Sequence, residues 1–90
     1  MTDRPWKLLY TKQGLKDKQT AMENGFREKV LSLTALLKEN PYAEYPPCEK
    51  LVGNMSGAYS RRLNRQHRLV YRVFDELHTV KIISFWTPYE

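Results

Sequence analysis

Hydrophobic and polar positions in the first half of the chain recur with the period of an α-helix. A short apolar run at residues 6–10 has the length of one strand. Two helices are then predicted, over residues 11–23 and residues 26–39, because apolar side chains return at helical spacing. These side chains are Leu15 and Met22 in the first helix, and Phe26, Val30, Leu33 and Leu37 in the second. We therefore expect a strand followed by two amphipathic helices.

The period changes to that of β-strands after a proline-rich connector. Residues 41–48 contain three prolines, and we expect them to cross the surface in an extended form. Residues 58–63, 68–74 and 79–86 are predicted strands, and the short polar breaks between them favour antiparallel hairpins. The elements together predict one α+β domain over residues 1–90, with two N-terminal helices packed on a twisted antiparallel sheet.

The first predicted hairpin concentrates positive charge. A turn centred near Arg65 places Arg62 opposite Arg68, and both side chains then lie on one face of the sheet. Leu69 and Tyr71 take the other face, which suits packing on the helices. Like charges that face each other destabilise a hairpin unless an anion lies between them. Two interpretations stay open here: a clamp for phosphate groups, and a surface ion-pair cluster in which Arg62 pairs with Glu44, Glu49 or Asp75.

Composition narrows the partners and the chemistry. The 90 residues contain 15 Lys and Arg against 10 Asp and Glu, and the formal net charge of +5 favours a polyanion as partner. No apolar run reaches the ~18 residues of a membrane span, and the first residues lack the apolar core of a signal peptide. We therefore expect a cytoplasmic protein without membrane contact. Cys48 is the only cysteine, and the histidines and carboxylates lack metal-ligand spacing, so we expect no metal and no other cofactor.

Glu49 is the candidate general base, because it is the only acid between Glu44 and Asp75. A carboxylate near arginines stays ionised, and it can take a proton from a ribose 2′-hydroxyl while the arginines stabilise the charge that grows on the phosphate. On spacing alone, a solvated loop glutamate is the simpler interpretation. His67 follows the arginine turn, where it can contact RNA or simply lie on the surface, and His78 falls in the opposite turn.

Four segments of the chain carry a recognisable signature. They are Glu49-Lys50-Leu51, the stretch SGAYSRR at residues 56–62, the stretch HRLVY at residues 67–71, and the stretch SFWTPYE at residues 84–90. In these segments the chain resembles the Txe/YoeB family of bacterial toxins, which belongs to the wider RelE-like group from toxin–antitoxin modules. The resemblance covers residues 6–90 and implies the RelE-like microbial RNase fold.

The family resemblance also implies an activity and a set of partners. It implies an endonuclease that enters the ribosomal A site, cuts mRNA there and so inhibits translation. A cognate antitoxin of the YefM/Axe type is expected to neutralise it, and operator DNA is expected to be contacted only through the toxin–antitoxin complex. A homodimer is also compatible with the resemblance.

The resemblance assigns roles to individual residues. Glu49 falls on the general base, Arg68 on the arginine that stabilises the transition state, Arg62 on a supporting phosphate contact and Tyr89 on the C-terminal catalytic tyrosine. The remaining basic side chains of the hairpin, which are expected to bind RNA phosphates, are Arg61, Arg65 and His67.

One position departs from the family pattern. The family places a histidine before the C-terminal tyrosine as general acid toward the leaving 5′-oxygen, and this chain has Pro88 there. Loss of a positioned general acid costs about 10²–10⁴ in rate. His67 and His78 are not expected to replace it, because each is predicted in a different turn. Three explanations stay open: Tyr89 or a ribosomal group donates the proton, the protein is a weakened RNase that mainly binds, or the chain is an attenuated variant of an active toxin. The alternative functions are a binding protein that has lost catalysis and, less favoured, a gyrase-inhibiting relative.

Overall fold

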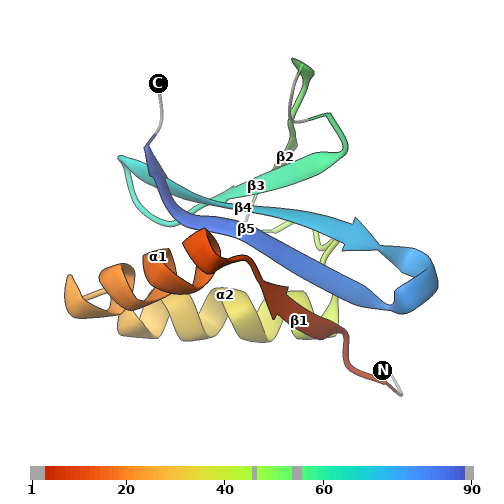
Figure 1. The fold of residues 1–90 in the computed structure, drawn as a ribbon, viewed down its shortest axis with the longest axis horizontal. Helices are drawn as coiled ribbons and strands as arrows, with labels where there is room; N and C mark the ends of the chain where they lie inside the picture. The colour runs from red at the N-terminus through yellow and green to blue at the C-terminus, as the bar shows by residue number, and fades with distance from the viewer. Residues whose placement is uncertain (1–3, 46, 54–55, 89–90) are drawn as a thin grey trace.

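A computed structural model describes residues 4–45, 47–53 and 56–88, with the backbone alone for residues 87 and 88. The described strands form one sheet in the order β1-β5-β4-β3-β2, and both helices lie against one of its faces (Figure 1). The elements in chain order are β1 (Lys7–Tyr10), α1 (Lys12–Glu23), α2 (Arg27–Glu39), β2 (Cys48–Lys50), β3 (Ala58–Arg62), β4 (His67–Phe74), the 3-10 helix η2 (Asp75–Leu77) and β5 (Thr79–Pro88). The predicted α+β class is confirmed.

The sheet is mixed, whereas the sequence predicted an antiparallel one. Strands β3, β4 and β5 are antiparallel neighbours, as expected from their short connections, and β2, which lies outside the predicted strands, pairs antiparallel with β3. Strand β1 runs parallel to β5, with Lys7 opposite Thr79 and Tyr10 opposite Ile82. No hairpin turn joins these two strands, so their relative direction is not fixed by a tight connection. Helices α1 and α2 instead carry the chain from β1 at one edge of the sheet to β2 at the other.

Helix α1 is capped by Thr11 and packs on the sheet through small residues. Thr11 is the N-cap, and its side chain accepts a hydrogen bond from the Gly14 backbone N–H at 2.9 Å. The buried face of α1 consists of Gly14 and Ala21, while Leu15 is 58% exposed, contrary to the predicted face. A Cβ atom at Gly14 would lie 2.5 Å from the Ile82 carbonyl oxygen. Glycine therefore allows the helix backbone to lie directly on β5.

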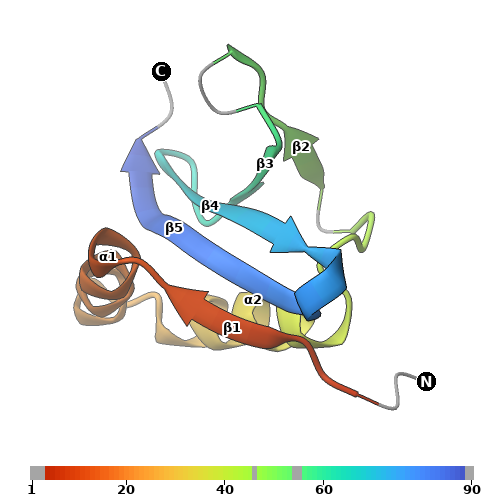
Figure 2. The same ribbon diagram turned by 45° about the vertical axis from the view of Figure 1, so that its right-hand side comes forward.

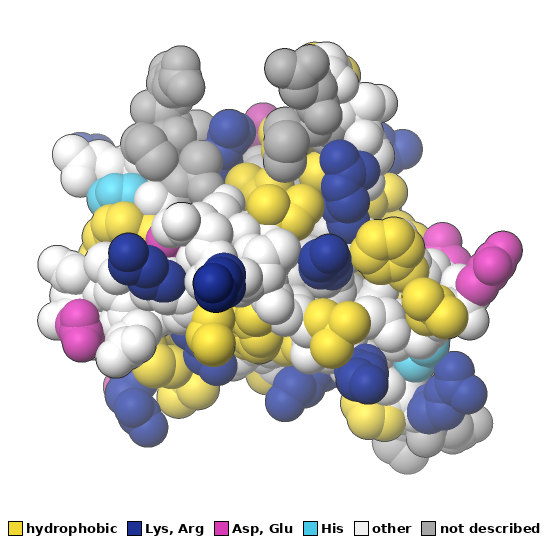
Figure 3. Space-filling view, in the orientation of Figure 1, with side chains coloured by type: hydrophobic (Ala, Val, Ile, Leu, Met, Phe, Trp, Pro, Cys, Tyr) yellow, Lys and Arg dark blue, Asp and Glu magenta, His cyan; other side chains and the backbone are white. Residues whose placement is uncertain are grey.

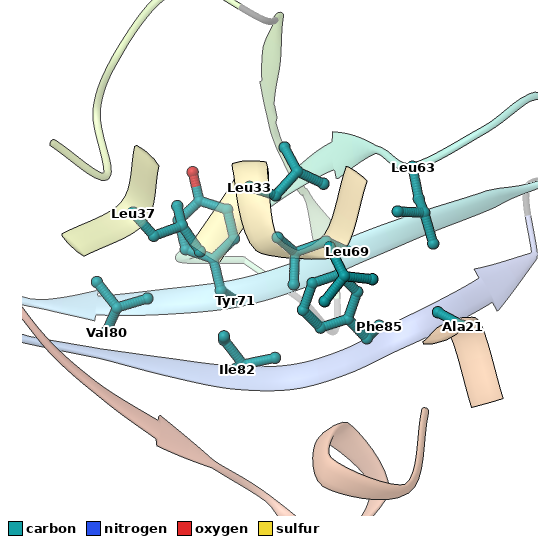
Figure 4. Close-up of a cluster of buried hydrophobic side chains, with 10 residues drawn as sticks. Ala21, Leu33, Leu37, Leu63, Leu69, Tyr71, Val80, Ile82 and Phe85 are labelled. Carbon is teal, nitrogen blue, oxygen red and sulfur yellow. The ribbon is translucent and has the colours of Figure 1, made fainter. Parts of the chain in front are cut away.

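Helix α2 and the sheet form the core (Figure 4). Leu33 and Leu37 from α2 pack toward Leu69 and Tyr71 of β4, which confirms that these β4 side chains face the helices. The buried hydrophobic cluster comprises Ala21, Val30, Leu33, Leu37, Leu63, Leu69, Tyr71, Val80, Ile82 and Phe85. Within the described part of the chain, neither helix has the length and apolar character to span a bilayer.

Candidate active site

The β3–β4 hairpin presents two arginines on one face. Arg62 lies directly opposite Arg68, as predicted. The turn is held by the Asn64 side chain, whose Oδ1 accepts hydrogen bonds from the backbone N–H groups of Gln66 and His67, each at 2.7 Å. The Arg62 side chain is exposed and that of Arg68 is half-buried. The hairpin therefore holds two arginines at directly opposed positions of one face, near its closed end.

Glu49 joins this face from the neighbouring strand. It lies opposite Ser60 of β3, and Arg62 follows two residues further along that strand. Because side chains alternate along a strand, Glu49, Arg62 and Arg68 all project away from the helices, from strands spaced about 4.8 Å apart. The exposed Glu49 carboxylate makes no hydrogen bond or ion pair with a described residue. The predicted alternative of an Arg62–Glu49 ion pair is therefore not observed.

The sheet face that carries Glu49, Arg62 and Arg68 is bordered on two sides by strand ends that rise above it. In Figures 1 and 2, β2 with the adjoining part of β3 and the end of β5 rise on the side of the sheet away from the helices, and β4 lies between them. Figure 3 shows the molecule from the side, in the orientation of Figure 1, and lysine and arginine side chains are spread over that side while most acidic side chains lie toward its left and right edges. Basic side chains therefore also lie on a surface beside the site, and this suits a polyanion.

Arg61 does not belong to the site, although we predicted it as a phosphate contact. It lies opposite Leu69, on the helix side of the sheet, and is completely buried. Its Nε donates to the Tyr71 hydroxyl at 3.0 Å, and its Nη2 donates to the carbonyls of Pro41 and Ala43 at 3.2 and 2.6 Å. A side chain with no exposed surface cannot reach a docked RNA, so we remove Arg61 from the proposed phosphate contacts.

The same network explains the shape of the connector. The connector turns and bends instead of crossing the surface in the predicted extended form, because its carbonyl oxygens accept hydrogen bonds from Arg61. Burial raises the pKa of Tyr71 well above its ordinary value, and the hydrogen bond with Cys48 acts in the same direction. The neutral Tyr71 hydroxyl donates to the Pro41 carbonyl at 2.8 Å. This buried network joins the connector to β3 and β4.

The Arg61→Ala change is expected to lower the free energy of unfolding by about 3 kcal/mol or more, because it leaves a cavity and buried carbonyls without donors. The measurement is urea unfolding followed by circular dichroism. The matched control is Arg62→Ala, an adjacent arginine whose side chain is exposed, for which we expect less than about 1 kcal/mol. Equal losses in the two variants would contradict a structural role specific to Arg61.

His67 lies closer to position 88 than the sequence predicted. It is the first residue of β4, and its backbone lies directly opposite Pro88 of β5. Its imidazole stacks on the Trp86 indole, with ring centroids 3.7 Å apart and planes 12° apart, and is half-buried. The expectation that a separate turn keeps His67 away from position 88 is therefore wrong. His78 does lie beyond the far end of β4, where its ring stacks on Trp6.

Two other predicted site residues are placed less fully. Arg65 is exposed in the β3–β4 turn, next to the two paired arginines. Tyr89 lies outside the described residues, and for Pro88 the structure gives the backbone only. The structure thus brings Glu49, Arg62 and Arg68 onto one face and places the backbone of position 88 at the edge of the same region.

Comparison with known proteins places this arrangement in a family. A family model for YoeB-like toxins of bacterial type II toxin-antitoxin systems matches residues 10–89. Toxin YoeB of Mycobacterium bovis is 35% identical over 48 residues, which make up 53% of this chain and 56% of that protein. The chain therefore matches little more than half the length of this curated relative.

Solved structures match over nearly the whole chain. A YoeB/ParE toxin from Agrobacterium tumefaciens has a TM-score of 0.82 and 30% identity, and the match covers 92% of this chain and 99% of that one. The Staphylococcus aureus YoeB dimer has a TM-score of 0.79 and 31% identity, covering 94% and 99%. YoeB in the heterotetrameric YoeB–YefM complex of the same organism has a TM-score of 0.77 and 31% identity, covering 93% and 98%. This chain belongs to the YoeB-like toxin family of bacterial type II toxin-antitoxin systems, within the RelE-like superfamily.

Proposed function

We propose that this toxin is a metal-independent endoribonuclease that cuts mRNA in the A site of translating ribosomes in the cytoplasm. The observation that carries the proposal is the placement of Glu49, Arg62 and Arg68 on one face of three adjacent strands. In cleavage of RNA by the ribose 2′-hydroxyl, a carboxylate can act as the base that deprotonates this hydroxyl. Two guanidinium groups can supply the positive charge that stabilises the adjacent phosphate. Membership of the YoeB-like family supports the same activity.

The proposed reaction is an in-line transesterification. The Glu49 carboxylate takes the proton of the ribose 2′-hydroxyl, and the 2′-oxygen forms a bond to the adjacent phosphorus. Arg68 and Arg62 stabilise the additional negative charge of the pentacovalent transition state. The bond between phosphorus and the 5′-oxygen then breaks, and that oxygen takes up a proton. The products are a 2′,3′-cyclic phosphate and a 5′-hydroxyl end, and Glu49 returns its proton to water.

The proton for the leaving 5′-oxygen needs a donor other than position 88, because proline has no titratable group. Two donors are compatible with the chain: the adjacent Tyr89 and a group of the ribosome. Arg65 and His67 at the closed end of the hairpin are proposed to contact RNA phosphates. We expect slower cleavage than in a toxin with a positioned acid at this position.

The proposed partners follow from the relatives. YoeB of Staphylococcus aureus forms a heterotetrameric complex with YefM and is also known as a dimer. We propose that a cognate antitoxin of the YefM/Axe type neutralises this toxin and that operator DNA is contacted only through their complex. We also propose that the free toxin can form a homodimer.

A second candidate function is favoured by Pro88. A toxin that has lost catalysis with its general acid can still occupy the ribosome, or act with its antitoxin as a co-repressor, while the mRNA stays intact. This alternative uses the same basic face for binding and assigns no chemical step to Glu49.

Primer extension on mRNA from translating ribosomes tests the proposal. We expect new 5′ ends within A-site codons when the toxin is added, and none when it is mixed first with its antitoxin. Arrested translation with intact mRNA would support the binding alternative. Intact mRNA with unimpaired translation would contradict cleavage and ribosome occlusion. Antitoxin-dependent operator binding would then test the co-repressor, and a DNA supercoiling assay would test the gyrase-inhibiting alternative.

A further inference from the structure

Ser60 lies at the centre of the proposed site and has an unused hydroxyl. Its side chain is completely buried, although it is on the face of β3 that carries the exposed Arg62. Its Oγ has no hydrogen-bond partner among the described residues. A buried hydroxyl without a partner costs free energy, and such groups in native proteins are few enough to need an explanation.

The residue directly opposite Ser60 on β2 is the proposed base, Glu49. Ser60 pairs with Glu49 of β2 on one side and with Val70 of β4 on the other. Directly opposed side chains in an antiparallel pair have Cβ atoms about 4.5–5.5 Å apart, and a glutamate chain is long enough to fold its carboxylate onto a serine hydroxyl at that distance. Val70 offers no polar atom. A hydroxyl without a hydrogen-bond partner therefore lies opposite a glutamate whose carboxylate no described residue binds.

We propose that Ser60 is a positioning residue for Glu49. In the free protein the exposed carboxylate is solvated by water. When RNA covers the site and removes that water, the Ser60 hydroxyl donates a hydrogen bond to one carboxylate oxygen. The other oxygen is then held toward the ribose 2′-hydroxyl, in the orientation that proton transfer needs. This inference rests on the proposed function, since it assigns Ser60 no contact with the reacting atoms.

The stability of the free protein gives the first readout. Replacing a serine with a structural role removes a hydrogen bond that stabilises the folded protein. Ser60→Ala instead removes a buried hydroxyl that has no partner among the described residues. The melting temperature of Ser60→Ala is therefore expected to be unchanged or raised. A function that is retained at a cost to stability is typical of active-site residues.

The test is single-turnover cleavage of mRNA on programmed ribosomes by the parent toxin, Ser60→Ala and Ser60→Thr. At saturating toxin we expect Ser60→Ala to be about tenfold slower, with the same half-saturating toxin concentration and no loss of melting temperature. Ser60→Thr keeps the hydroxyl but adds a methyl group. The melting temperature of this variant shows whether the methyl group fits, and a variant that keeps its melting temperature is expected to cleave faster than Ser60→Ala.

Each outcome bears on the inference. Parent-like cleavage by Ser60→Ala, a slower rate explained by a lower melting temperature, or a changed half-saturating concentration alone would overturn the role of Ser60. Equal slowing in a Ser60→Thr variant that keeps its melting temperature would overturn it as well. If the parent toxin leaves the mRNA intact, the proposed function fails and this inference with it. If the parent cuts and only the Ser60 comparison fails, the proposed function stands.

Discussion

Removing either charge of the proposed site, by Glu49→Gln or Arg68→Ala, is expected to slow mRNA cleavage on the ribosome by about 10²–10⁴-fold. Glutamine has nearly the size and shape of glutamate but cannot accept the 2′-hydroxyl proton. Alanine at position 68 removes the guanidinium that stabilises the pentacovalent phosphate. The measurement is the single-turnover rate at saturating toxin, where ribosome binding no longer limits the signal.

The matched control for Glu49→Gln is Glu44→Gln. Glu44 is also an exposed acid, but it lies on the connector before β2, outside the proposed site. We expect it to cleave at the rate of the parent toxin, so that a general effect of removing one negative charge is separated from the loss of the base. A Glu49→Gln variant that cuts as fast as the parent would show that the assigned base is wrong. Arg68→Lys should retain part of the activity, since lysine keeps the charge but not the planar fork.

The face of the sheet that carries this site was predictable from local sequence alone. The turn near Arg65 and the alternation of side chains fix the register of one hairpin, and the structure confirms Arg62 opposite Arg68. The same register pairs Arg61 with Leu69, on the core side. The burial of Arg61 could therefore have been inferred, but the crowding of arginines directed attention to phosphate binding instead.

Other parts of the site depend on long-range pairing and could not be predicted. The β4–β5 ladder starts with Phe74 opposite Thr79, and a regular ladder would bring His67 opposite Trp86. Two register shifts, between Arg68 and Val70 and between Val70 and Tyr71, change the pairing, and His67 lies opposite Pro88 instead. Hydrophobic periodicity gives no sign of such bulges. The burial of Ser60 and the parallel pairing of β1 likewise depend on contacts between distant parts of the chain.

Pro88→His is expected to raise the cleavage rate at least tenfold. Position 88 ends the β5 ladder opposite His67, one residue beyond the pair formed by Arg68 and Thr87. An imidazole at this position would add a proton donor at the end of the β5 ladder, and general acid catalysis contributes about 10²–10⁴ when the donor is well placed. The gain should be largest near or below neutral pH and fall at higher pH, because only the protonated imidazole donates and the ordinary pKa of histidine is about 6.5.

The matched control is Pro88→Gln, which separates acid catalysis from a change in the backbone. Proline has no backbone N–H to donate to a neighbouring strand, and any other residue restores that donor. If glutamine gives the same gain as histidine, the effect comes from the backbone. The sharper comparison uses mRNA in which sulfur replaces the bridging 5′-oxygen at the cleavage site, since a thiolate leaves without being protonated. On that substrate the advantage of Pro88→His over Pro88→Gln should disappear. An advantage that persists there, or no gain with histidine on normal mRNA, would show that the missing acid at position 88 does not limit this toxin.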